Sequence, residues 1–155
     1  MKNRPVVVIG LGNDYRSDDA AGLLIARRIK KISPDTVRVV EGVSDTAALF
    51  DAWKGAEKVI IVDAAASGMN PGRIYRFNAL IENIPEDFFC SYSTHDFSIT
   101  DSVELASTLG ELPDEIIIFG IEGERFMHGS TLSPEVEKAI PDLTKRILDE
   151  ITETN

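Results

Sequence analysis

Near the N-terminus the chain has the sequence Val6-Val7-Val8-Ile9-Gly10-Leu11-Gly12-Asn13-Asp14-Tyr15-Arg16-Ser17-Asp18-Asp19-Ala20-Ala21-Gly22. In this stretch an apolar run ends in a Gly-x-Gly turn, and two adjacent acids follow. The continuous apolar run at residues 6–9 is typical of a buried parallel strand, and the pattern at residues 18–31 predicts a helix. The two acids, Asp18 and Asp19, should therefore open that helix beyond the carboxyl end of a central strand. In open α/β sheets this is the edge at which ligands bind.

The rest of the chain alternates apolar runs with helical patterns. Apolar or β-branched runs predict strands at residues 36–40, 58–62, 73–77 and 115–120, and helical spacing predicts helices at 45–54, 98–110 and 133–151. Ser133 is the expected N-cap of the last helix with Pro134 at its first position, and Pro141 should break or kink it. These elements predict the α/β class: a three-layer α/β/α sandwich with a mostly parallel twisted sheet of about five strands, residues 73–77 forming an antiparallel edge strand.

The composition favours one soluble domain. A length of 155 residues suffices for a single domain with a buried core, so we expect one domain over residues 1–155. The net charge of -10 argues against a nucleic-acid partner, which needs clustered Lys and Arg. No stretch approaches the roughly 20 apolar residues of a membrane helix, so no membrane insertion is expected. A single cysteine suits a reducing compartment, and we expect a cytoplasmic monomer.

Acidic residues and one histidine should meet at the same edge of this predicted sheet. Asp18 or Asp19 follows the first strand, Asp63 follows the third, Glu122 follows the last, and His95 lies in a loop. Two carboxylates and an imidazole suit a divalent transition metal. Each residue also has an ordinary interpretation. The negative charge of Asp18 is favourable at a helix N-terminus, and Asp63 can cap the turn that follows its strand. His95 can be a loop residue with no ligand. Their coincidence is what predicts a metal-contact site.

Several other catalytic patterns are absent from the sequence. There is no His-Glu-x-x-His pair and no Gly-x-Ser-x-Gly elbow. Cys90, five positions before His95, could form a nucleophilic pair, but its aromatic neighbours favour a small buried hydrophobe. Tyr15 stands where a dinucleotide-binding fingerprint needs its third glycine, so NAD is not expected. Trp53 is expected in the core and His128 in a surface loop.

A set of motifs runs in order along nearly the whole chain: Gly10-x-Gly12-Asn13, Asp18-Asp19 with Gly22, the strand-ending Asp63, Ser93-Thr94-His95, Gly120-Ile121-Glu122, and Gly129-Ser130-Thr131-Leu132-Ser133-Pro134-Glu135-Val136. In combination they resemble the nickel-iron hydrogenase maturation endopeptidases. The resemblance implies a twisted sheet sandwiched between helices. It also implies an enzyme that trims a short C-terminal extension from the hydrogenase large subunit after nickel has been inserted.

The resemblance further implies which residues form the site. Carried over position by position, Asp19, Asp63 and His95 contact the metal and are the expected catalytic residues. The nickel is carried by the partner, the large-subunit precursor, so the enzyme need not hold a metal of its own. Nickel could polarise the scissile carbonyl or activate water, or one carboxylate could act as general base while nickel only anchors the substrate. Asp19 is the shorter acid where the family also has glutamate, Ala20 stands where glycine is frequent, and Gly123 where proline is common.

Two other functions fit parts of the sequence. The opening Gly10-Leu11-Gly12-Asn13 also resembles peptidyl-tRNA hydrolases, an esterase family that needs a downstream histidine and a basic groove. This chain has Asp18 and Asp19 near that histidine's place and is acidic. A non-catalytic chaperone that docks on a maturing metalloenzyme is the second alternative. For a protein substrate, the loops at residues 64–70 and 122–132 are the expected contact surface.

Overall fold

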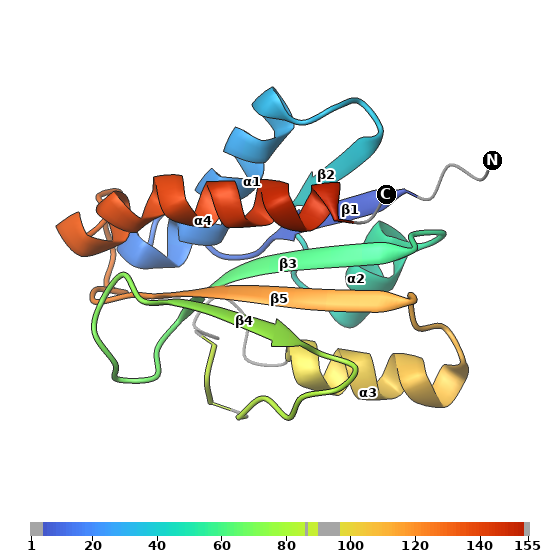
Figure 1. The fold of residues 1–155 in the computed structure, drawn as a ribbon. Coiled ribbons are helices and arrows are strands. Elements are labelled where there is room, and N and C mark those ends of the chain that lie inside the picture. The colour runs from blue at the N-terminus through green and yellow to red at the C-terminus, as the bar shows by residue number, and fades with distance from the viewer. Residues whose placement is uncertain (1–4, 86, 90–96, 154–155) are drawn as a thin grey trace.

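The computed structural model describes residues 5–85, 87–89 and 97–153, which form a five-stranded sheet between two layers of helices (Figure 1). The strand order is β2-β1-β3-β5-β4; the first four of these strands are parallel, and β4 pairs antiparallel with β5 at one edge. The predicted α/β sandwich with an antiparallel edge strand is confirmed. The elements are β1 (Val6–Gly10), η1 (Ser17–Ala20), α1 (Ala21–Ile32), β2 (Val37–Glu41), α2 (Thr46–Trp53), β3 (Lys58–Ala65), β4 (Ile74–Asn78), α3 (Ile99–Leu109), β5 (Glu115–Glu122) and α4 (Pro134–Thr152).

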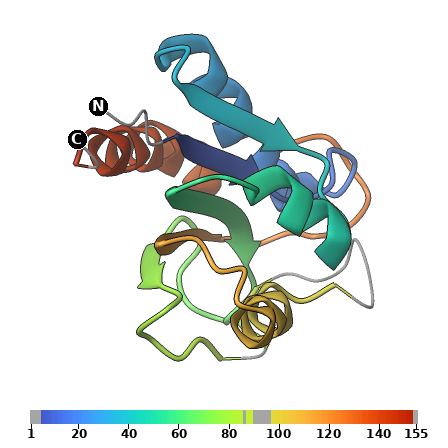
Figure 2. The ribbon, with the colours of Figure 1, turned by 90° about the vertical axis from the view of Figure 1, so that its right-hand side faces the viewer.

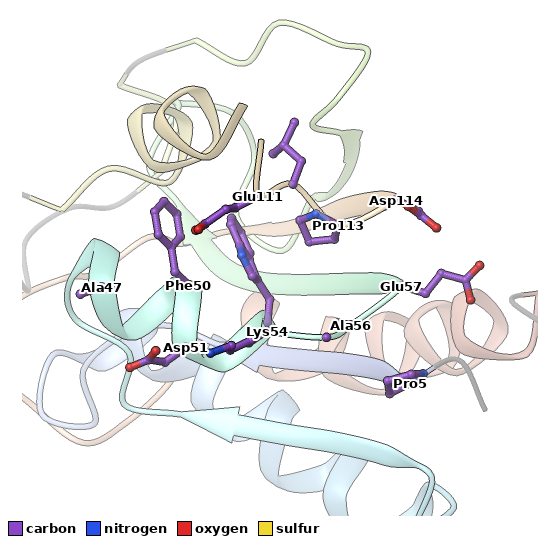
Figure 3. Close-up of a pocket in the computed structure, with 13 residues that line it drawn as sticks. Pro5, Ala47, Phe50, Asp51, Lys54, Ala56, Glu57, Glu111, Pro113 and Asp114 are labelled. Atoms are coloured by element: carbon purple, nitrogen blue, oxygen red, sulfur yellow. The ribbon is translucent and has the colours of Figure 1, made fainter. Parts of the chain in front are cut away.

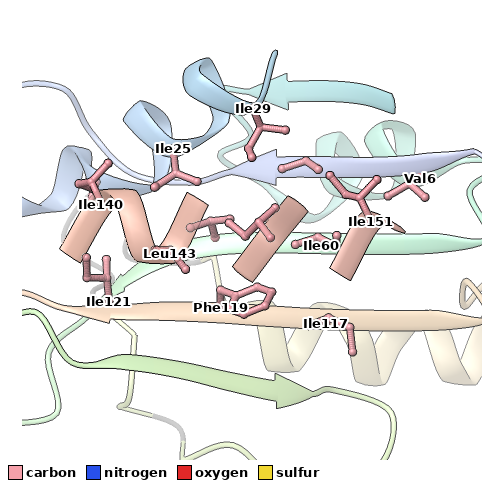
Figure 4. Packing of buried hydrophobic residues seen from close by; sticks show 14 of the residues in the cluster. Val6, Ile25, Ile29, Ile60, Ile117, Phe119, Ile121, Ile140, Leu143 and Ile151 are labelled. Carbon is pink, nitrogen blue, oxygen red and sulfur yellow. The ribbon is translucent and has the colours of Figure 1, made fainter. Parts of the chain in front are cut away.

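Alternate side chains of the central strands enter two separate hydrophobic clusters, one on each face of the sheet. The face toward α1 and α4 is packed with large apolar side chains, among them Val6, Ile25, Ile60, Phe119 and Leu143 (Figure 4). The opposite face packs against α2 and α3, as the view along the strands shows (Figure 2), and buries Trp53 as predicted. Full burial of one such side chain stabilises the fold by about 1.5–3 kcal/mol. None of the helices in the described ranges combines the length and apolar character needed to cross a bilayer.

Two glycines allow α1 to lie directly against the carboxyl ends of β1 and β3. A Cβ atom on Gly10 would lie 2.5 Å from the carbonyl oxygen of Gly22, and a Cβ on Gly22 would lie 2.5 Å from the carbonyl oxygen of Val62. A larger side chain at either position would push α1 away from the sheet. Because η1 immediately precedes α1, these contacts decide how closely the acids of η1 approach the end of β3.

A buried ion pair fastens the C-terminal end of α4 to the sheet. Lys58 Nζ lies 2.6 Å from Glu150 Oε2, and the two side chains are only 3% and 5% exposed. The other carboxylate oxygen of Glu150 accepts a hydrogen bond from Arg76 Nε at 2.7 Å. This network joins α4 to the start of β3 and to β4, at the opposite end of β3 from Asp63.

Some predicted boundaries were wrong. Strands β3 and β5 are longer than predicted, so Asp63 and Glu122 lie within strands and not after them. Asp18 and Asp19 lie in a separate 3-10 turn, η1, instead of opening α1 itself. Pro141 does not break α4, because the residues before and after it bury one continuous apolar face on the sheet, and that packing outweighs the loss of one helical hydrogen bond.

Candidate active site

Turn η1 and strand β3 bring Asp19 and Asp63 to the carboxyl edge of the sheet. Strands β1 and β3 are neighbours, with Gly10 opposite Val62, and the N–H of Leu11 donates to the carbonyl of Val62 at 2.9 Å. Asp63 is the next residue of β3 and is 5% exposed, and Asp19 is fully buried. Asp19 from η1 and Asp63 from β3 are thus both shielded from water at this edge of the sheet.

The Asp63 carboxyl is difficult to ionise. Burial raises its pKa well above the ordinary value, and the negative charge of Asp19 raises it further. The N–H of Ala64 donates to Asp63 Oδ1 at 2.8 Å and acts in the opposite direction, but it does not offset the other two causes. Two carboxylates in this position repel each other, so a cation between them would favour the ionised form of both.

Gly12 is required for the backbone path that positions Asp19. Its φ is +133°, a conformation that side-chain-bearing residues rarely adopt, and a Cβ atom on Gly12 would lie 1.9 Å from the carbonyl oxygen of Asp19. That same oxygen accepts a hydrogen bond from the N–H of Asn13 at 3.2 Å. The Gly-x-Gly turn therefore folds back on η1 and holds the main chain of Asp19 close to the end of β1.

Asp18 binds the loop between β5 and α4. Its Oδ2 atom accepts hydrogen bonds from the N–H groups of Glu124 (2.8 Å) and Arg125 (2.9 Å) and from Ser133 Oγ (2.6 Å), and its Oδ1 accepts from the N–H of Ser133 (2.8 Å). Burial would raise the pKa of Asp18, but these hydrogen bonds outweigh it and lower the pKa. Of the two adjacent acids, Asp18 therefore holds the loop, and Asp19 is the one whose charge acts on Asp63.

Ser133 occupies the predicted position at the start of α4, but its side chain has another partner. It is the N-cap residue of α4, but its side chain makes no capping hydrogen bond. The hydroxyl donates to Asp18 instead. The Ser133-Pro134 pattern thus predicted the start of the helix correctly but did not predict the contact between Ser133 and Asp18.

The backbone of the turn before Asp19 is also joined to the β5–α4 loop. The N–H of Ser17 donates to the carbonyl of Gly129 at 2.8 Å, and the N–H of Gly129 donates to the carbonyl of Tyr15 at 2.9 Å. Ser17 Oγ donates to the carbonyl of Met127 at 3.1 Å. Ser17 also has a φ of 52°, in the left-handed region that non-glycine residues seldom occupy. No local spacing connects residues 17 and 129, which is why the sequence does not predict these contacts.

Glu122 belongs to the structure of the β3–β4 loop and not to the acidic pair. Its carboxylate accepts hydrogen bonds from Ser67 Oγ, from the N–H of Ser67 at 2.9 Å and from the hydroxyl of Tyr75 at 2.8 Å. In Figure 1 this loop extends from the left-hand ends of β3 and β4. Glu122 lies at the same carboxyl edge of the sheet as Asp63, as expected, and its carboxylate is held there by donors from the β3–β4 loop and from β4.

The predicted His95 lies outside the described residues, as do Ser93, Thr94 and Cys90. Among the residues that the structure describes, no three His, Cys, Asp or Glu side chains are grouped as a metal site. The described part of the chain thus contributes a pair of carboxyl groups, and the third contact remains a prediction about His95. His128 is exposed, as predicted.

A hollow of about 1030 Å³ lies at the other end of the strands (Figure 3). Its lining includes Pro5, Glu57 and Asp114, which directly precede β1, β3 and β5. Neither Asp19 nor Asp63 lines it. Since ligands of open parallel sheets bind at the carboxyl ends of the strands, the acidic pair marks the candidate site and this hollow does not.

Comparison with known proteins agrees with the fold and with the motifs. The family model described as hydrogenase maturation protease matches residues 23–150, a span that begins after Asp19 and includes Asp63. The hydrogenase 2 maturation protease of Escherichia coli is 26% identical over 152 residues, which cover 96% of this chain and 92% of that protein. The coenzyme F420 hydrogenase subunit delta of Methanothermobacter thermautotrophicus is 26% identical over 161 residues, 94% of each chain. Among solved structures, the hydrogenase maturating endopeptidase HybD from E. coli has a TM-score of 0.81 at 24% identity and covers 97% of this chain and 94% of its own. The chain therefore belongs to the hydrogenase maturation protease family and is a hydrogenase maturation endopeptidase.

Proposed function

We propose that the protein removes a short C-terminal peptide from the precursor of the nickel-iron hydrogenase large subunit once nickel has been inserted. The family supplies the reaction class and implies the large subunit as the substrate. The observation that carries the nickel-dependent step is the buried pair of Asp19 and Asp63 at the carboxyl edge of the sheet. The family match also favours this function over a peptidyl-tRNA hydrolase and over a non-catalytic chaperone.

The acidic pair gives a physical reason for a response to nickel. Burial and the charge of Asp19 disfavour the ionised form of Asp63, so a divalent cation that enters between the two replaces a repulsion with two attractions. Carboxylate oxygens and an imidazole nitrogen suit a divalent transition metal, and we assign the third contact to His95. In this proposal the nickel arrives as part of the precursor. A precursor without nickel offers no cation to the pair, and the enzyme distinguishes the two forms in this way.

Cleavage of the peptide bond requires an activated water and a polarised carbonyl. A divalent ion beside the scissile bond can supply both. A carboxylate with a raised pKa is also a stronger base than an ordinary aspartate and can accept the proton of the attacking water. Asp63 Oδ1 is engaged by the N–H of Ala64, so Oδ2 is the oxygen that we assign to metal contact or proton transfer.

The test is to compare cleavage of nickel-loaded and nickel-free precursor by purified enzyme. We expect only the loaded form to be processed, and we expect Asp19→Asn, Asp63→Asn and His95→Ala each to slow processing by about 100-fold or more. The matched control is Asp142→Asn, which changes an aspartate that is 56% exposed and is ion-paired to Arg146 on α4. Equal processing of nickel-free precursor would overturn the recognition role. Purified wild-type protein that binds the nickel-loaded precursor without cleaving it would point to a binding protein.

A further inference from the structure

We propose that Asp18 is a positioning residue that keeps Asp19 in place by fastening the β5–α4 loop to turn η1. This contact, called the clasp below, consists of Asp18 on η1 and of Glu124, Arg125 and Ser133 at the two ends of the loop. The inference rests on the proposed function in one respect, since that function names Asp19 and Asp63 as the groups that must be positioned.

The carboxylate of Asp18 is the centre of the clasp. It is fully buried and accepts four hydrogen bonds, one from each of Glu124 N, Arg125 N, Ser133 N and Ser133 Oγ. Hydrogen bonds to an ionised acceptor are about twice as strong as those between neutral groups. Their donors come from both ends of the loop, just after β5 and just before α4, so one side chain closes the loop on itself and onto η1.

The main chain around Asp18 is fixed by the same loop. The N–H of Asp18 donates to the carbonyl of Arg125 at 2.9 Å, and Arg16 forms a parallel bridge with Gly129. The peptide groups of Asp19 are fixed in turn, because its N–H donates to the carbonyl of Arg16 at 3.1 Å. The direction in which the Asp19 side chain leaves the backbone therefore depends on where the loop holds its neighbour.

The clasp is separate from the interactions that hold the fold together. The sheet and its helices are held by the two apolar clusters and by the Lys58–Glu150 pair at the far end of β3. The clasp joins two connecting segments within the described residues, one after β1 and one after β5, from which only Leu11 and the partly buried Leu132 belong to those clusters. Loosening it should therefore displace Asp19 relative to Asp63 more than it unfolds the protein.

The experiment replaces Asp18 with asparagine. An amide at this position would turn its N–H₂ group toward the N–H groups of Glu124 and Arg125, or toward that of Ser133, and would release one end of the loop. We expect the affinity of the purified enzyme for Cd²⁺, used as a probe ion, and the kcat for nickel-loaded precursor each to fall by about 10–100-fold, the range seen when groups that orient metal contacts are changed. Neither the fall in Cd²⁺ affinity nor the fall in kcat requires Asp18 to contact the ion or the substrate.

The matched control is Glu150→Gln. It changes a second buried carboxylate, which accepts from Lys58 and Arg76, at the opposite end of β3. We expect this variant to lower the urea midpoint while leaving Cd²⁺ affinity and kcat unchanged. Asp63→Asn separates the two proposals: full cleavage by Asp63→Asn would refute the proposed function, and loss of cleavage by Asp63→Asn with full cleavage by Asp18→Asn would refute the clasp alone.

A milder variant decides the matter if Asp18→Asn does not fold. Ser133→Ala removes one of the four hydrogen bonds to Asp18 and the acceptor of a longer one from Arg125 Nε, 3.3 Å, within the same loop. Its control Thr144→Val removes a buried hydroxyl that donates to the carbonyl of Ile140 within α4. We expect Ser133→Ala to weaken Cd²⁺ binding and processing several-fold, and Thr144→Val to change neither. Cd²⁺ affinity and kcat for Ser133→Ala equal to those of Thr144→Val would overturn the positioning role.

Discussion

Replacement of Asp63 by asparagine should stabilise the metal-free protein at neutral pH while abolishing its activity. Asparagine has nearly the same shape, and its side-chain oxygen can still accept the hydrogen bond from the N–H of Ala64. What it removes is a buried acid whose ionised form is disfavoured by burial and by the charge of Asp19. An active site that places two carboxyl groups together in this way carries a cost in stability, and the variant relieves it.

The sign and size of the effect follow from the raised pKa of Asp63. The pKa of Asp63 is higher in the folded than in the unfolded state. The favourable contribution of protonated Asp63 to the stability of the wild-type protein is therefore fully present below the unfolded pKa and is lost as the pH rises through the folded pKa. Each unit of pKa difference corresponds to about 1.4 kcal/mol. Since the pKa lies well above 3.8, the stability of Asp63→Asn minus that of wild type should increase by at least about 1 kcal/mol between pH 4 and pH 8.

The assay is urea unfolding of both proteins in a chelating buffer at several pH values from about 4 to 8. Glu150→Gln is an informative control because its sign is opposite. Burial raises the pKa of Glu150, but the hydrogen bonds from Arg76 and Lys58 outweigh it and lower the pKa, so the deficit of Glu150→Gln should grow as the pH rises. A stability difference between Asp63→Asn and wild type that stays constant across this range would refute the reasoning about the acidic pair.

The other predictions concern the backbone turn and the core. Gly12→Ala should abolish processing and lower the free energy of unfolding by more than about 1 kcal/mol, because its Cβ would meet the carbonyl of Asp19 at 1.9 Å in a conformation that favours glycine. Lys58→Met should cost about 3–5 kcal/mol in urea unfolding, because it leaves the carboxylate of Glu150 buried without its nearest cation. Leu143→Ala should cost about 2–5 kcal/mol, since Leu143 is fully buried between α4 and the sheet, while leaving kcat intact in the folded fraction. A Gly12→Ala enzyme with normal processing, or either of the other two variants within about 1 kcal/mol of wild type, would contradict these expectations.

The central strands β1, β3 and β5 were predictable from the sequence because they are buried on both faces. Apolar runs such as residues 58–62 are typical of central strands in a parallel sheet, whereas the strand order β2-β1-β3-β5-β4 was not predicted. The ends of the strands were not predictable in the same way. β3 continues through Asp63 and two alanines, and the pattern of a charged residue followed by small residues does not predict a strand.

The acidic pair was also partly predictable. Asp63 and the two acids of η1 meet because β1 and β3 are adjacent parallel strands, a rule that needs no side-chain detail. From residue patterns alone, Asp18 and Asp19 could not be told apart. Their different roles depend on a loop more than a hundred positions away, whose N–H groups point at Asp18. The donors that hold Glu122 were not predictable for the same reason, since Ser67 lies in the loop after β3 and Tyr75 lies in β4.

The most direct test of the account is a crystal of the wild-type enzyme soaked in a cadmium salt, with the ion located by its anomalous scattering. We expect a single peak contacted by carboxylate oxygens of Asp19 and Asp63 and by a nitrogen of His95, with Asp18 still bonded to the β5–α4 loop. A peak held by Asp18 or Glu122 instead, or no peak beside Asp63, would contradict the claim that these three residues recognise the metal of the precursor.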